Sequence, residues 1–146
     1  MLYGNETGWA AADAERAFGK ALRARRRASL ARRVLRRCVE CARLMVVDGH
    51  GGGRSGAGHG VRDIPLDAIV GSLEPNRAAH FDSEFRPSPP ARSRWLRVWL
   101  AEQRGAVLPP ISVAPIGGDA YAVRDGHHRV SVARARGALA ISATVA

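Results

Sequence analysis

The segment from Tyr121 to Gly137 constrains the fold of this chain more than any other part of its sequence. Its residues predict a short strand, a tight turn at Asp125-Gly126, and a helix that ends at Gly137. The first N–H groups of a helix have no partner inside the helix, and the helix dipole favours negative charge at that end. The turn therefore predicts a site at which a phosphate group can bind.

The side chains at this turn suit phosphate chemistry. Gly126 lets a ligand approach the backbone, and Arg129 offers a guanidinium group within reach of it. His127 and His128 can donate to a phosphate or, when neutral, act as a base. Asp125 can orient a histidine or, together with ligand phosphates, hold Mg²⁺. The alternative is that Asp125 caps the helix and that both histidines are exposed.

Residues 61–146 predict one small α/β (α+β) domain around this turn. The expected strands are a short one at the start of this region, one that contains Ile111 and Val113, and two more at 120–124 and 140–145. Helices are expected at 89–104 and 127–136. Pro65 is expected to start a helical turn, and 71–87 is expected to be a loop anchored by Phe81 and Phe85. Trp95 and Trp99 are expected in the core, with a base-stacking platform as the alternative.

The positive charge of the chain is concentrated before residue 61. The net charge is +10; residues 1–60 hold 12 basic and 5 acidic residues (+7), and residues 61–146 hold 11 and 8 (+3). Residues 13–47 lack proline and are rich in Ala, Arg and Leu, which predicts an amphipathic basic helix. This helix either binds DNA, RNA or a partner, or packs on the core with its arginines in water. The candidate nucleic-acid contacts are Arg32, Arg33, Arg36 and Arg37.

Cys38 and Cys41 form a C-x-x-C motif within this expected helix. His50 and His59 follow, but they lie nine residues apart in a glycine-rich run, whereas structural zinc sites use two tight pairs of ligands. We therefore predict no metal site here. The cysteines are expected one helical turn apart, as small apolar residues.

Residues 48–60 contain seven glycines and predict a flexible linker. A glycine-rich phosphate loop is the alternative, but the G-x-x-x-x-G-K-[ST] pattern is missing. The chain is thus expected to comprise a basic helical arm (1–47), a linker (48–60) and a nucleotide-binding domain (61–146).

Three segments, in family order, resemble the N-terminal nucleotide-binding domain of the ParB/sulfiredoxin superfamily, in its small stand-alone form. They are Ile64-Pro-Leu-Asp-Ala-Ile69, the loop from Pro75-Asn-Arg77 to Arg86, and Asp125-Gly-His-His-Arg-Val-Ser-Val-Ala133 with Gly137. The third segment is the most specific, and the resemblance covers about the last 85 residues, 61–145. It implies a mixed-sheet domain that binds a nucleotide, CTP or ATP.

The resemblance also implies which residues bind that nucleotide. By position, the phosphates would be held by Gly126, His127, His128 and Arg129, with Arg77 or Arg86 from the earlier loop. In sulfiredoxin a similar Gly-Cys-His-Arg segment binds ATP and its cysteine does the chemistry, whereas ParB usually has a glutamate there that assists CTP hydrolysis. His127 stands at that position here, so neither activity carries over from the resemblance.

Three functions are consistent with these observations. The first is a nucleotide-binding regulatory module, associated with DNA through the basic arm. The second is a phosphotransferase or nucleotide hydrolase in which His127 or His128 is the base and Asp125 holds Mg²⁺. The third is nucleic-acid binding through the arm, with the α/β domain as a scaffold.

The sequence also bears on location and assembly. No apolar run approaches the roughly 18–20 residues of a membrane helix, and the N-terminus lacks a secretory layout. A cytoplasmic protein without a membrane partner is expected. The oligomeric state stays open, a homodimer included.

Overall fold

The computed structural model describes residues 6–38, 40–48 and 60–145. Within them the chain forms one six-stranded mixed sheet and four α-helices, which confirms the predicted α/β class. The strands are β1 (Met45–Val46), β2 (Val61–Pro65), β3 (Ile69–Ser72), β4 (Ile111–Gly117), β5 (Ala120–Asp125) and β6 (Ala140–Val145). The helices are α1 (Glu6–Val34), α2 (Pro75–Ala78), α3 (Arg92–Gln103) and α4 (His127–Ala135), with 3₁₀ turns at Glu40–Ala42, Leu66–Ala68 and Pro89–Ala91.

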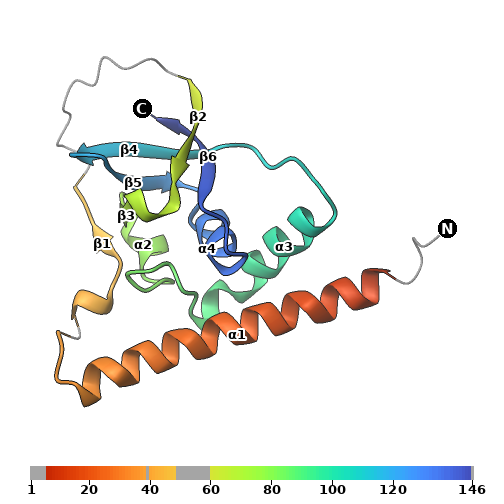
Figure 1. Cartoon of the computed structure of the whole chain (residues 1–146), viewed down its shortest axis with the longest axis horizontal. Coiled ribbons are helices and arrows are strands. Elements are labelled where there is room, and N and C mark those ends of the chain that lie inside the picture. The colour runs from red at the N-terminus through yellow and green to blue at the C-terminus, as the bar shows by residue number, and fades with distance from the viewer. Residues whose placement is uncertain (1–5, 39, 49–59, 146) are drawn as a thin grey trace.

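The strand order places β5 in the middle of the sheet. The order is β1-β3-β5-β4-β6-β2, with β1/β3, β3/β5 and β4/β6 parallel and β4/β5 and β2/β6 antiparallel. The chain leaves β5 at Asp125 and enters α4 at His127. The predicted strand, turn and helix around Gly126 are therefore confirmed, and the turn lies between the sheet and the helices (Figure 1).

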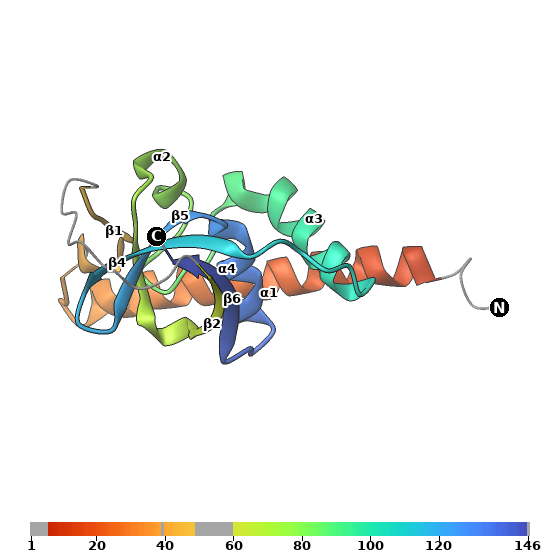
Figure 2. The same ribbon diagram turned by 90° about the horizontal axis from the view of Figure 1, so that it is seen from above.

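The helices pack beside the sheet around one buried tryptophan. Trp95 of α3 is fully buried, and its indole N–H donates to Ser131 Oγ of α4 at 2.9 Å. Phe18 of α1 meets Trp95 edge-on, with ring centroids 5.5 Å apart, so the long helix α1 packs along α3 (Figures 1 and 2). Trp99 stacks on Trp95, and its ring is covered by the Arg136 guanidinium 4.0 Å away. The core role predicted for Trp95 is confirmed.

The N-terminal helix ends earlier than the sequence predicts. It was expected to reach residue 47, but α1 stops at Val34, and Arg36 adopts a left-handed φ of 53°. Leu44 is then buried, and β1 pairs with β3. The contact is close, because a Cβ at Gly71 would lie 3.0 Å from the Met45 carbonyl oxygen. Tertiary pairing thus overrides the helical propensity of this segment.

Two further expectations are wrong. Cys38 and Cys41 are not small apolar residues one turn apart on an α-helix. Cys41 lies in the 3₁₀ turn Glu40–Ala42, both residues are exposed, and a disulfide joins them. Residues 69–72, expected in a helical turn and a loop, form β3, because the buried Ile69 and Ser72 line up beside β5. Phe81 and Phe85 are buried as predicted.

Some expectations fall where the structure describes little. Apart from Asp48 and Gly60, the predicted linker 48–60 lies outside the described residues, as do His50 and His59. None of the helices in the described ranges has the length and apolar character needed to cross a membrane.

Candidate functional site

The turn between β5 and α4 is built on a glycine that no other residue could replace without strain. Gly126 is the N-cap of α4 and has a φ of +107°. A Cβ on this residue would lie 2.8 Å from Ile111 Cβ and nearer still to Ile111 Cγ2. The glycine thus lets α4 begin directly against β4, and its place is explained by packing on Ile111 as well as by backbone conformation.

A hollow of about 250 Å³ opens at this turn. Its lining residues come from α2, α3 and the turn itself: Arg77, Arg94, Arg97, Val98, Asp125, Gly126, His127, His128 and Arg129. Four of these residues are arginines and one is a carboxylate, so the hollow is strongly positive. The first turn of α4 adds the positive end of a helix dipole.

Asp125 is held by two of these arginines. Arg77 Nη1 donates to Asp125 Oδ1 at 2.7 Å, and Arg129 Nη2 donates to Oδ2 at 3.2 Å. The hydrogen bond from Arg77 is the main reason why the pKa of Asp125 lies below its ordinary value. Asp125 makes no side-chain cap on α4, so the capping alternative is wrong. The carboxylate instead keeps two guanidinium groups beside the hollow.

Arg129 is more enclosed than its place at the turn suggests. Its side chain is 16% exposed, and its Nη1 donates to the carbonyl oxygens of Pro109 and Pro110. These bonds join the start of α4 to the segment that leads into β4. Arg129 therefore lines the hollow and also positions its wall.

His127 is buried, with 1% of its surface exposed. Its Nε2 lies 2.5 Å from Ser72 Oγ, and its ring is stacked relative to that of Phe81, with ring centroids 6.3 Å apart. Its buried Nδ1 has no hydrogen-bond partner among the described residues. Burial, followed by the charge of Arg77, lowers the pKa of His127 to about 4. The ring is therefore neutral at pH 7, and the expectation that this histidine could be exposed is wrong.

The short contact between Ser72 and His127 is not a nucleophile paired with its base. Ser72 is fully buried, so no outside substrate can reach its Oγ. That oxygen also accepts the backbone N–H of Glu74 at 2.9 Å and lies 3.2 Å from the Glu74 carbonyl oxygen. The pair therefore fastens the end of β3 to the start of α4.

His128 is half-buried and lies edge-on to Phe81, with ring centroids 5.1 Å apart. Burial is the main cause that lowers the pKa of His128 to about 4, and the charge of Arg94 is the next. A group with such a pKa is a weak general base at neutral pH, because efficient bases titrate near the working pH.

Arg86 does not join the hollow. It pairs with Glu84 at 2.5 Å and with Asp82 at 3.4 Å, on the side that faces α1. Of the predicted ligand residues, the structure thus brings together Arg77 and the turn from Gly126 to Arg129, and leaves Arg86 apart.

Sequence reasoning missed Arg94 and Arg97. Both are exposed on α3, three residues apart, and line the hollow. In the described part of the chain, neither lies within 4.0 Å of a carboxylate. In the sequence, these two arginines lie off the Trp95/Trp99 face of the expected helix, which predicts that they are exposed. It does not predict that they approach the turn at Asp125-Gly126, more than 25 residues later in the chain.

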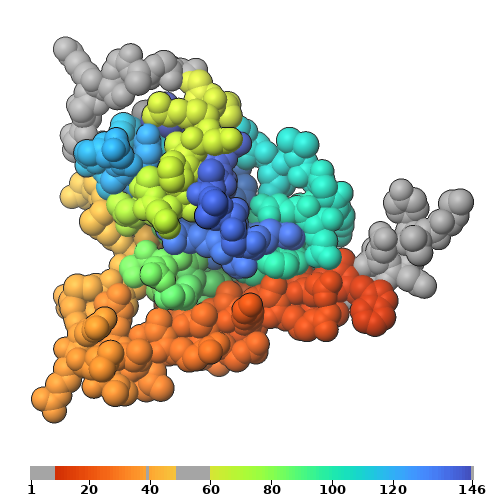
Figure 3. All heavy atoms as spheres, viewed as in Figure 1, coloured from red at the N-terminus to blue at the C-terminus, as the bar shows by residue number. Residues whose placement is uncertain are grey.

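The arginines predicted to contact nucleic acid do not share a helix. Arg32 and Arg33 lie in the last turn of α1, whereas Arg36 and Arg37 follow its end, so the four side chains do not extend from one helix. Arg32 and Arg37 line a second hollow, of about 710 Å³, between α1 and residues 75–86. Figure 3 shows α1, in red to orange, along the lower edge of the molecule.

Among the described residues, no group of three or more His, Cys, Asp or Glu side chains is placed to hold a metal ion. No protein-family model, curated protein or solved structure matches this chain. The geometry of the turn is therefore the ground on which a function can be proposed.

Proposed function

We propose that the hollow at the start of α4 binds the phosphate groups of a nucleotide, CTP or ATP, and that this chain is a nucleotide-binding regulatory module. The observation that carries the proposal is the convergence of four arginines and a helix N-terminus on one hollow with a single carboxylate. Arginine binds phosphate through a planar pair of donors, and α4 adds N–H groups without helical partners. An anionic ligand would neutralise this concentration of positive charge.

The size of the hollow supports a phosphate chain as the part that is enclosed. Its 250 Å³ is below the range of about 300–1,000 Å³ in which proteins enclose whole small molecules. Val98 is the one aliphatic side chain in the lining, so the hollow offers little apolar surface against which a base could pack. We infer that the sugar and base lie toward solvent and that CTP and ATP bind with similar affinity.

The charges at the site support binding over catalysis. His127 and His128 each have a pKa of about 4 and are weak bases at pH 7. Both oxygens of Asp125 accept from arginines, so the carboxylate does not suit Mg²⁺ as it stands. Any Mg²⁺ would arrive with the nucleotide. A phosphotransferase or nucleotide hydrolase at this site is the alternative, and phosphate release lost in His128→Ala would support it.

Thermal unfolding with CTP, ATP, GTP and inorganic tripolyphosphate, each with and without Mg²⁺, tests the proposal. Ligand at a hundred times its Kd adds about 2.7 kcal/mol of stability, which such a measurement resolves easily. We expect all four compounds to stabilise the protein, and Arg94→Gln/Arg97→Gln to remove most of the effect. The matched control is Arg104→Gln, which removes an exposed arginine just after α3. No stabilisation, or a double variant that responds fully, would reject the proposal.

A second candidate function is nucleic-acid binding beside α1. The 710 Å³ hollow there is lined by Arg25, Arg32, Arg37, Arg43 and Arg86, a charge that suits a phosphate backbone. Affinity for duplex DNA or RNA should then fall steeply with salt, and less steeply in Arg25→Gln/Arg37→Gln. An unchanged dependence of affinity on salt would exclude this hollow as the contact.

We place both proposed activities in the cytoplasm, where nucleotides and nucleic acids are found.

A further inference from the structure

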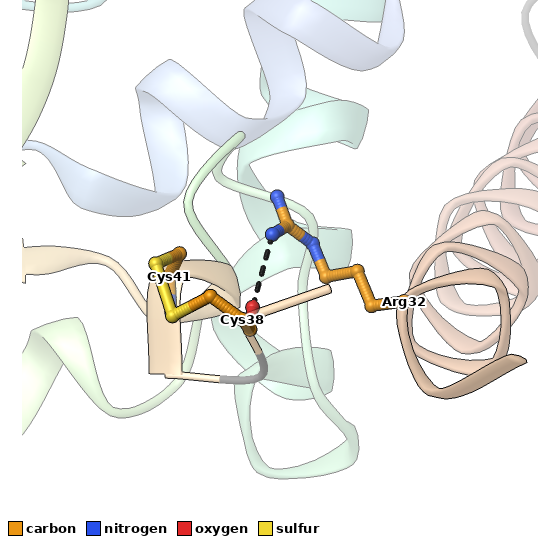
Figure 4. The surroundings of a disulfide bond; sticks show 3 residues. All are labelled: Arg32, Cys38 and Cys41. Atoms are coloured by element: carbon orange, nitrogen blue, oxygen red, sulfur yellow. Dashed lines mark hydrogen bonds between the residues drawn. A yellow bond between two sulfur atoms is a disulfide. The ribbon is translucent and has the colours of Figure 1, made fainter. Parts of the chain in front are cut away.

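We propose that Cys38 and Cys41 form a redox-active centre that exchanges two electrons with a dithiol. The two cysteines lie between the end of α1 and the start of β1 and are joined by a disulfide (Figure 4). Both are exposed, so the sulfur atoms of another molecule can approach them. This proposal is independent of the nucleotide site.

The two sulfur atoms have different surroundings. The backbone N–H of Cys41 points at Cys38 Sγ, with 3.2 Å between nitrogen and sulfur. When the disulfide opens, a thiolate at Cys38 can keep this donor. In the described part of the chain no donor is directed at Cys41 Sγ in the same way. Cys38 is therefore the better leaving group and the better nucleophile of the pair.

The charges around Cys38 also favour its thiolate. Arg32, from the last turn of α1, donates to the carbonyl oxygen of Cys38 at 3.2 Å, which holds a positive charge beside the backbone of this cysteine (Figure 4). The other charged residues of the stretch 35–43 are Arg36, Arg37, Glu40 and Arg43. Positive charge stabilises a thiolate and raises the fraction of a cysteine that can react. The single glutamate only partly offsets the arginines.

The disulfide contributes little to holding this segment in place. It closes a loop with two intervening residues, and the stabilisation from a disulfide grows with the length of the loop. The segment is already held by the buried Leu44, by β1 pairing with β3, and by the bond from Ser83 N–H to the Ala42 carbonyl oxygen at 2.8 Å. Reduction should therefore leave the fold intact, as a reversible redox centre requires.

The proposed exchange balances as follows. One thiolate of the dithiol attacks Cys41 Sγ, the bond between the cysteines breaks, and Cys38 leaves as the thiolate that accepts from the Cys41 N–H. The second thiolate of the dithiol then attacks the dithiol's sulfur in the mixed disulfide, and Cys41 leaves. Each cysteine takes up a proton. The dithiol loses two electrons and two protons and becomes a disulfide. The protein gains both electrons as a pair of thiols.

Alkylation of the folded full-length chain tests the assignment. Cys41→Ser leaves only Cys38, and Cys38→Ser leaves only Cys41, so mass spectrometry after timed reaction with iodoacetamide at pH 7 gives each thiol's own rate. We expect Cys38 to react about tenfold faster than Cys41, and Arg32→Gln in the Cys41→Ser background to slow it severalfold. The control Arg124→Gln, in an exposed position on β5, should not change the rate.

A second measurement follows the wild-type disulfide. Reduced dithiothreitol should release two thiols per chain without a change in circular dichroism, and oxidised glutathione should close the disulfide again. Equal alkylation rates of Cys38 and Cys41 would overturn the proposal. So would thiols that appear only after the protein is denatured.

Discussion

The two arginine-rich hollows of this molecule differ in how their charges are arranged. At the start of α4, Arg77 and Arg129 are held by one carboxylate, and Arg94 and Arg97 have no carboxylate partner in the described chain. The hollow beside α1 is larger, but it includes Asp82 and Glu84, and both pair with Arg86. The number of arginines is therefore a poor guide to an anion site. Their convergence, and the donors they have left to offer, distinguish the first hollow from the second.

The largest expected effect comes from the glycine that shapes the smaller hollow. Gly126→Ala adds a Cβ against Ile111 in a backbone with a φ of +107°, and should reduce the free energy of unfolding by about 2–5 kcal/mol. Gly118→Ala is the matched control, because its φ is also positive but nothing lies within 4 Å of the added atom. It should cost only about 1–2 kcal/mol. Equal losses in urea denaturation would show that packing on Ile111 is unimportant.

Acid should destabilise the folded protein through His127, which lines this hollow. The pKa of His127 is about 4 in the folded chain and 6.5 in the unfolded chain. Between these values the unfolded state binds the proton and the folded state does not, so stability is full above pH 6.5 and falls toward pH 4. The shift corresponds to roughly 3 kcal/mol.

Unfolding measured across this pH range in His127→Asn separates that contribution. The asparagine does not titrate, so the loss between pH 6.5 and pH 4 should be smaller than in the wild type. The part that remains includes His128, whose pKa is shifted in the same direction. Identical pH profiles of the two proteins would contradict the neutral, buried state of His127.

Ligand stabilisation compares the two hollows directly. With tripolyphosphate at a hundred times its Kd, Arg94→Gln/Arg97→Gln should lose most of about 2.7 kcal/mol, while Arg25→Gln/Arg37→Gln keeps it. Calorimetric titration of both variants gives the two affinities. If the second variant loses more than the first, the assignment of the anion site to the smaller hollow is wrong.

The smallest effect is expected at Arg86. Its two ion pairs are partly exposed, and such pairs contribute about 0–1 kcal/mol. Arg86→Gln should therefore change stability by less than about 1 kcal/mol and leave the response to nucleotide unaltered. A loss of nucleotide binding in this variant would support the prediction from the sequence that Arg86 is a phosphate ligand.

Predictions from neighbouring residues succeeded where no long-range pairing opposed them, and they failed where such pairing did. Gly126 and the residues on either side specify a strand, a turn and a helix within 17 residues. The segment after Val34 has equally clear helical propensity, but it turns away because Leu44 is buried and β1 pairs beside Gly71. Such pairing between residues far apart in sequence leaves no periodic pattern in a strand of two residues.

By itself, the sequence determined the turn at Asp125-Gly126, the helix after it and the burial of Trp95, because backbone conformation and side-chain spacing are local properties. Only the tertiary structure decided which charges meet there. It brought Arg77 from α2 and Arg94 and Arg97 from α3 to the turn, and it kept Arg86 with Asp82 and Glu84. The physical reason is that the distance between two charges depends on how their elements pack, and no local pattern encodes it.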